Sequence, residues 1–98
     1  MTTQLRIYEI TPGHLDAFVE AWRTGVAPLR IRFGFAIDGA WALPASSRFV
    51  WVARYDGPLS WEEAEERYYG SDERAALDPD PARWVEGPRS EFADAVRL

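Results

Sequence analysis

The chain has 98 residues, no cysteine, one histidine and a formal net charge of -5 at pH 7. This length predicts one domain, residues 1–98, with a single hydrophobic core. The absence of cysteine excludes disulfides and thiol catalysis, and one histidine leaves too few ligands for an ordinary zinc site. An acidic chain without a basic run also lacks the charge pattern of nucleic-acid binding. We expect no charged leader and no apolar run of about 18 residues, hence a cytoplasmic protein without a membrane partner.

The first predicted strand covers residues 4–10 ("QLRIYEI"), which are rich in β-branched and aromatic side chains and precede a Thr-Pro-Gly break. Its alternation separates Leu5 and Ile7 from Arg6 and Tyr8. We assign the first pair to the core. The second pair is assigned to the face of the sheet that carries no helix.

A long helix is predicted next, with Thr11 as its N-cap and Pro12 in its first position. Apolar residues follow at steps of three and four up to Gly34, which is typical of a helical stripe. Pro28 interrupts this stripe, so we expect a kink there. The stripe consists of Leu15, Phe18, Trp22, Val26, Leu29 and Phe33.

Two further strands, residues 35–41 and 48–55, are joined by the turn-forming "LPASS" as a hairpin. In the second strand, Phe49 and Trp51 alternate with Val50 and Val52. We expect Phe49 and Trp51 on the helix-free face, beside Arg6 and Tyr8.

A second helix is predicted to begin at Trp61, because Ser60 and Glu63 form a capping box, and to stop at Gly70. Ser71 then caps a short turn. Two Asp-Pro steps keep the following segment out of a helix. Residues 90–98 ("SEFADAVRL") are predicted as the last strand.

The order β-α-β-β-α-β is that of the ferredoxin-like split βαβ arrangement, an α+β fold with an antiparallel sheet and helices on one face. Five Trp, four Tyr and five Phe exceed what so small a core needs. A short chain without disulfides also gains stability from self-association. We therefore expect a homodimer in which two sheets pack face to face as a dimeric α/β barrel.

Five segments, in order, resemble the NIPSNAP family, a branch of the dimeric α/β-barrel superfamily: "RIYEITPGHLDAFVEAW", "PLRIRFGF", "GAW", "RFVWVARYDG" and "YYGSDERAALDPDPA". Where many members have Trp two residues before the tyrosine of the third strand, this chain has Ala53. The resemblance covers nearly the whole chain and implies a ferredoxin-like subunit, a homodimer and a cavity between sheet and helices. It leaves the chemistry open, since the superfamily includes cofactor-free monooxygenases, haem-degrading enzymes and isomerases.

Arg6 and Tyr8 have two interpretations. They could anchor an anion or carbonyl, with Arg6 supplying charge and Tyr8 a hydrogen bond, or they could form a dimer-interface contact. In either case a buried Arg6 needs a partner, and Glu9 on the opposite face cannot be it. Large aromatic residues could likewise line a cavity for a planar apolar ligand or fill the core and interface. The candidate ligand-binding residues are Arg6, Tyr8, Trp41, Trp51, Tyr68 and Tyr69.

Other polar residues have plainer interpretations. His14 in the first helical turn could be a haem ligand or general base, but that position is typical of exposed residues. The run "EEAEER" is typical of a solvated helix face with a Glu63–Arg67 pair, and Asp80 of a helix N-cap, rather than of a calcium site. We expect no metal and no cofactor.

The leading function is that of a NIPSNAP-like homodimer that binds a small, partly apolar ligand or acts as an interaction module. The alternative is a cofactor-independent monooxygenase acting on an aromatic substrate. Arg6, Tyr8 and Trp51 would then bind the substrate and stabilise the anion that meets oxygen. A third possibility is a structural dimer with a filled interior. A cavity of at least about 300 Å³ beside Arg6 and Tyr8 would support both ligand hypotheses.

Overall fold

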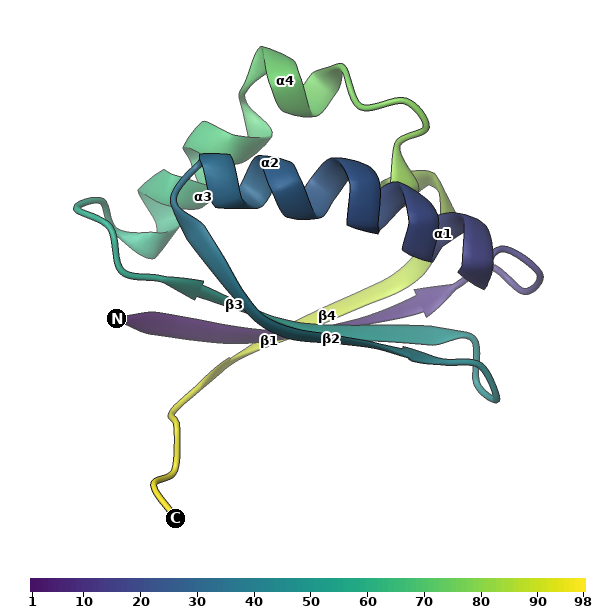
Figure 1. Ribbon diagram of the computed structural model, residues 1–98, viewed down its shortest axis with the longest axis horizontal. Helices are drawn as coiled ribbons and strands as arrows, with labels where there is room; N and C mark the ends of the chain where they lie inside the picture. Colours follow the sequence, from purple (N-terminus) through teal and green to yellow (C-terminus); the bar gives the residue numbers. More distant parts are fainter.

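The computed structural model describes all 98 residues as a four-stranded antiparallel sheet with its helices on one face (Figure 1). The strand order β2-β3-β1-β4 confirms the predicted ferredoxin-like α+β fold. None of the helices is long and apolar enough to cross a lipid bilayer. The elements are β1 (Thr2–Ile10), α1 (Leu15–Ala21), the π-helix η1 (Trp22–Val26), α2 (Ala27–Arg32), β2 (Phe35–Leu43), β3 (Arg48–Tyr55), α3 (Trp61–Tyr69), α4 (Asp72–Ala75), the 3-10 helix η2 (Pro81–Trp84) and β4 (Val85–Ala93).

The first helix starts later than the sequence predicts. It begins at Leu15, and the predicted cap at Thr11 is wrong. The hydroxyl of Thr11 instead donates to the carbonyl of Trp84 at 3.2 Å, and its N–H donates to the same oxygen at 2.8 Å. Gly13, at φ 86°, completes the turn between β1 and α1. Thr11 is therefore used to hold η2 against the start of the first helix.

The irregularity expected at Pro28 lies one turn earlier. Residues Trp22–Val26 form a π-helix, in which the N–H of Ala27 reaches the carbonyl of Trp22. Pro28 has no N–H and crowds the backbone one turn before it, and a wider turn relieves that crowding. The chain from α1 to α2 consequently runs across the sheet as one continuous helical rod (Figure 1).

The capping signals of the second half are confirmed. The hydroxyl of Ser60 accepts from the N–H of Glu63 at 3.1 Å, and Glu63 accepts from the N–H of Ser60 at 3.2 Å. The hydroxyl of Ser71 caps α4 by accepting from the N–H of Arg74 at 3.1 Å, and Asp80 caps η2 by accepting from the N–H of Ala82 at 3.0 Å. These caps fix where the chain turns back from α3 toward the sheet.

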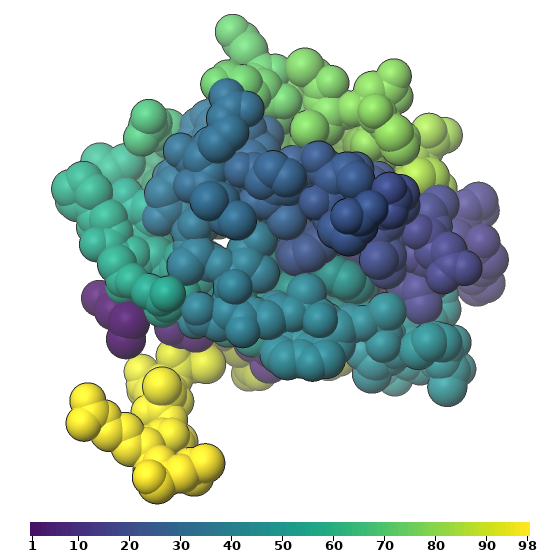
Figure 2. All heavy atoms as spheres, viewed as in Figure 1, coloured from purple at the N-terminus to yellow at the C-terminus, as the bar shows by residue number.

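The last strand begins earlier and ends earlier than predicted. It spans Val85–Ala93 and contains Pro88, which is tolerated because β4 is an edge strand with a free N–H side. The residues after Ala93 lie outside the strand and project from the body of the protein (Figures 1 and 2). Val96 and Leu98 are exposed there.

The predicted assignment of the two sheet faces is wrong. Tyr8, Phe49 and Trp51 pack against the helices, with Phe49 and Trp51 fully buried. Leu5 and Ile7 lie on the opposite, helix-free face. Alternation within a strand separates two sets of residues but does not say which set the helices cover. The core thus lies between the helices and the face that carries Arg6 and Tyr8. Its buried members are Ile10, Phe18, Trp22, Val26, Leu29, Phe35, Phe49, Trp51, Ala53, Tyr55, Trp61, Ala64 and Tyr68.

Candidate functional site

A cavity of about 470 Å³ lies between the helices and the β1-β3-β4 part of the sheet. Its walls come from every helical segment and from three strands, so no short stretch of sequence contains it. Five of the six candidate ligand-binding residues line it: Arg6, Tyr8, Trp51, Tyr68 and Tyr69. The cavity is also larger than the volume of about 300 Å³ at which ligand pockets begin.

Trp41 is the candidate residue that the structure places elsewhere. It lies opposite Val50 on the helix-free face, and 55% of its surface is exposed. A β-bulge between Ile37 and Gly39 explains this position, because an extra residue moves every later side chain to the other face. Without the bulge, Trp41 would share the face of Phe35 and point at the helices.

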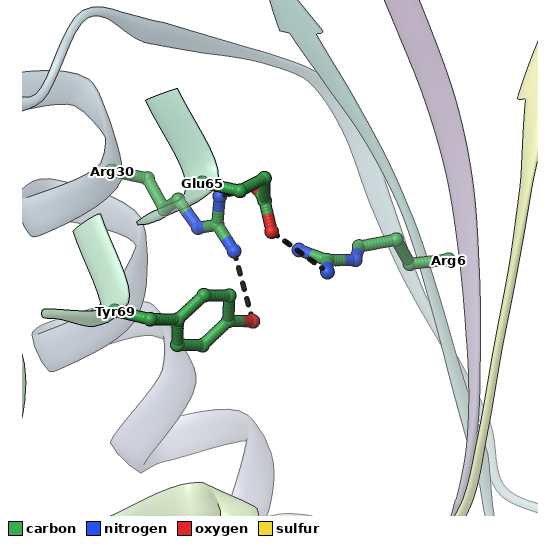
Figure 3. A network of polar contacts seen from close by, with 4 residues as sticks. All are labelled: Arg6, Arg30, Glu65 and Tyr69. Atoms are coloured by element: carbon green, nitrogen blue, oxygen red, sulfur yellow. Dashed lines mark hydrogen bonds and ion pairs between the residues drawn. The ribbon is translucent and has the colours of Figure 1, made fainter. Parts of the chain in front are cut away.

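The centre of the site is a carboxylate shared by two arginines (Figure 3). Glu65 of α3 accepts from Nη2 of Arg6 at 3.3 Å and from Nη1 of Arg30. The run "EEAEER" is predicted as a solvated helix face, but the helical spacing puts Glu65 on the face of Trp61 and Tyr68, and only 16% of its side chain is exposed. Glu65 is the partner that a buried Arg6 requires.

Arg30 is a central residue of the site that the sequence pattern does not single out. Its side chain is 1% exposed, and Nη2 donates to the hydroxyl of Tyr69 at 3.1 Å. The guanidinium also lies 4.0 Å from the centroid of the Tyr68 ring and 4.7 Å from that of Phe35. A signal for it was present. Glu65 falls among apolar residues on the packing face of α3, and a carboxylate in that position needs a cation opposite.

The cavity wall is cationic although the protein is acidic. Arg6, Arg30 and Arg74 line it, whereas no acidic residue does. Arg89 of the edge strand also borders the cavity, but it lies opposite Ile7, which places its side chain on the helix-free face. Arg74 forms an ion pair with Asp80 at 3.1 Å, and Asp80 itself does not line the cavity. Arg6 and Arg30 share the single charge of Glu65, so this pair of arginines keeps a surplus positive charge.

Burial raises the pKa of two tyrosines of the wall. It raises the pKa of Tyr8 above its ordinary value, against the opposing effect of Arg6. It likewise raises the pKa of Tyr68, against the effects of Arg30 and Arg74. Both hydroxyls are therefore phenols at neutral pH and can donate hydrogen bonds to a ligand.

His14 does not take part in the site. It is exposed at the start of α1, and its ring stacks on Trp84 with the centroids 5.9 Å apart. The cavity wall accordingly contains neither an imidazole nor a carboxylate that could act as a general base.

Comparison with solved structures identifies the fold. An uncharacterized NIPSNAP domain protein from Burkholderia xenovorans matches with a TM-score of 0.82 and 19% identity, over 98% of this chain and 95% of the other. A NIPSNAP family protein from Agrobacterium tumefaciens matches with a TM-score of 0.84 and 13% identity, over 97% and 92%. A putative antibiotic biosynthesis monooxygenase from Nitrosomonas europaea matches with a TM-score of 0.71 and 15% identity, over 97% of this chain and 89% of the other. No family model and no curated protein matches the sequence.

The chain therefore has the fold of NIPSNAP family proteins, as its sequence resemblance to that family implies, and shares it with monooxygenase-like proteins. At these low identities the likeness describes the backbone and not the chemistry. Any activity has to be argued from the side chains of the cavity.

Proposed function

We propose that this NIPSNAP-like domain binds a small, partly apolar molecule in the cavity between its helices and sheet. The observation that carries this proposal is the 470 Å³ cavity, nine of whose 16 lining residues are hydrophobic. Concave, largely apolar sites with a few convergent polar groups are typical of ligand pockets. Here the polar groups are arginines and tyrosines, and the aromatic wall favours a flat ligand body.

We also propose that the functional unit is a homodimer formed through the helix-free face of the sheet. That face carries a contiguous apolar set, Leu5, Ile7, Trp41, Leu43, Val50 and Val52. No helix covers that side of the sheet in Figure 1, and only the C-terminal segment extends below it. Its charges include both Glu9 and Glu91 and the arginines Arg48 and Arg89, so two copies related by a two-fold axis can pair opposite signs. Exposed apolar surfaces of this kind are costly in water.

Native mass spectrometry of the gently purified protein tests both statements in one spectrum. We expect a dimer that carries an additional noncovalent mass, which is lost when the protein is denatured. A bare dimer that binds none of a panel of planar organic molecules would point to an interaction module and would remove the ligand proposal. A monomer at micromolar concentration would remove the dimer.

The second candidate is a cofactor-independent monooxygenase acting on an aromatic substrate. It is favoured by the donors around the cavity, Arg6, Arg30 and Tyr8, which would stabilise an anionic substrate that reacts with O₂. Because the wall offers no general base, such a substrate must ionise in water before it binds. Oxygen uptake in step with the loss of an acidic polyphenol would support this function. Binding of the same compound without oxygen uptake would leave the binding function alone.

A further inference from the structure

Hydrogen-bond donors without partners gather around the cavity. Seven buried side-chain polar atoms have no partner within the protein, and six of them belong to residues that line the cavity. Five of the six are N–H groups that can only donate, and the sixth is a hydroxyl that can donate. They are Nη1 of Arg6, Nε1 of Trp22, Nε of Arg30, Nε1 of Trp51, the hydroxyl of Tyr68 and Nε of Arg74.

Such a cluster of donors indicates that a ligand of the cavity carries hydrogen-bond acceptors. Buried donors without acceptors are destabilising, and native proteins keep few of them. Here they belong to residues that line one cavity, and all of them can donate. A ligand that brings acceptors of its own would supply the partners that the protein itself does not offer.

The charge balance of the site favours an anionic ligand over a neutral one. Arg6 and Arg30 share only the carboxylate of Glu65, so one of their two positive charges is not neutralised by a neighbouring acid. The side chain of Arg30 is almost fully buried, where an excess charge is costly. A neutral acceptor would satisfy donors without balancing this charge, whereas an anion does both.

The walls define the rest of the molecule. The rings of Trp51 and Tyr68 are both 1% exposed and line the same cavity. Trp51 lies beside the guanidinium of Arg6, with Cζ 5.4 Å from the ring centroid. A flat, conjugated body can pack against these rings while its charged end meets Arg6.

We propose that the ligand is a planar aromatic or conjugated carboxylate, with its oxygens accepting from the free Nη1 of Arg6 and the hydroxyl of Tyr68. Glu65 already occupies Nη2 of Arg6 and Nη1 of Arg30, which leaves Nη1 of Arg6 without a partner within the protein. This inference rests on the proposed binding function and specifies the chemical class that the cavity takes.

Matched pairs of small molecules test it. The dissociation constants of benzoate and benzamide, and of 1-naphthoate and 1-naphthamide, are measured by calorimetry and by tryptophan fluorescence. Each pair has the same shape and differs in charge. We expect each carboxylate to bind at least about tenfold more tightly than its amide, since hydrogen bonds to charged groups are the stronger ones.

Variants assign the effect to the wall. Arg6→Gln is expected to weaken carboxylate binding about tenfold and to leave amide binding unchanged. Arg23→Gln removes the same charge from an exposed residue that pairs only with Glu20, and should change neither. Tyr68→Phe keeps the ring and the packing, and it provides a second reading if Arg6→Gln fails to fold. Tyr68→Phe should weaken the binding of the carboxylate more than that of the amide.

The outcomes separate the two proposals. Equal affinity of carboxylate and amide in the wild type would overturn the anion inference while the cavity remains a binding site. An equal loss of affinity for carboxylate and amide in Arg6→Gln and in Tyr68→Phe would mean that these residues only shape the cavity. That result would also overturn the anion inference. Failure of both members of every pair to bind would remove the proposed function and the inference with it.

Discussion

The carboxylate of Glu65 on α3 reaches the guanidinium of Arg6 on β1, with Oε2 and Nη2 3.3 Å apart. The contact joins two residues that are 59 positions apart and holds α3 against the centre of the sheet. Arg30 binds the other oxygen of the same carboxylate, so one acid holds together three elements. The same arrangement leaves the cavity wall positively charged.

Replacing Glu65 by Gln should destabilise the protein by about 3 kcal/mol, because it leaves two largely buried arginines without their counter-charge. The free energy of unfolding is to be measured by urea denaturation. Glu66→Gln is the matched control, since Glu66 is exposed on the same helix and should change stability by less than about 0.5 kcal/mol. Equal effects of the two substitutions would contradict a structural role for the Glu65 carboxylate.

Tyr68→Phe should leave the ligand-free protein as stable as the wild type or up to about 1 kcal/mol more stable. The hydroxyl of Tyr68 is buried and accepts or donates no well-formed hydrogen bond within the protein, so its removal costs at most a weak contact with the Arg30 guanidinium. Tyr55→Phe serves as a comparison, because the Tyr55 hydroxyl accepts from the N–H of Leu59 at 3.4 Å. Thermal unfolding of both variants measures the difference. A clear destabilisation by Tyr68→Phe would show that the hydroxyl has a partner in solution.

Alkaline titration should show two tyrosines that ionise late. Burial raises the pKa of Tyr8 and of Tyr68 in the folded protein above the value of about 10 of an unfolded chain. A raised folded pKa means that the stability from these groups is fully present below about pH 10 and is lost as the pH rises through the folded pKa. The ultraviolet absorbance of tyrosinate in the wild type and in Tyr8→Phe measures this. Ionisation of all four tyrosines near pH 10 in folded protein would contradict it.

Val50→Asp should separate the proposed homodimer into monomers. Val50 lies on the helix-free face, opposite Ile7 on one side and Trp41 on the other, so a carboxylate there would be buried between two sheets. Light scattering coupled to size exclusion gives the mass of each variant. Ala17→Asp on the exposed surface of α1 is the control and should leave the mass unchanged. An unchanged dimer in Val50→Asp would place the interface elsewhere.

Local signals in the sequence were sufficient for most of the fold. The capping box of Ser60 and Glu63, the cap at Ser71 and the apolar stripe before Gly34 each act within one or two turns, and each lies where it was predicted. Their order then left the ferredoxin-like arrangement as the fitting topology. Errors occurred where a local preference competed with a distant partner, as when Thr11 bonded to Trp84 instead of capping its own helix.

The candidate site could be predicted in its residue types and not in its geometry. Side chains alternate along a strand with a fixed period of two, so the local pattern is enough to put Arg6 and Tyr8 on one face. Which face meets the helices depends on what lies across the core, and therefore on contacts between distant segments. Glu65 and Arg30 make a charged residue in β1 stable inside, and a single bulge before Gly39 turns Trp41 away from it. These are contacts between distant segments, and no local periodicity contains them.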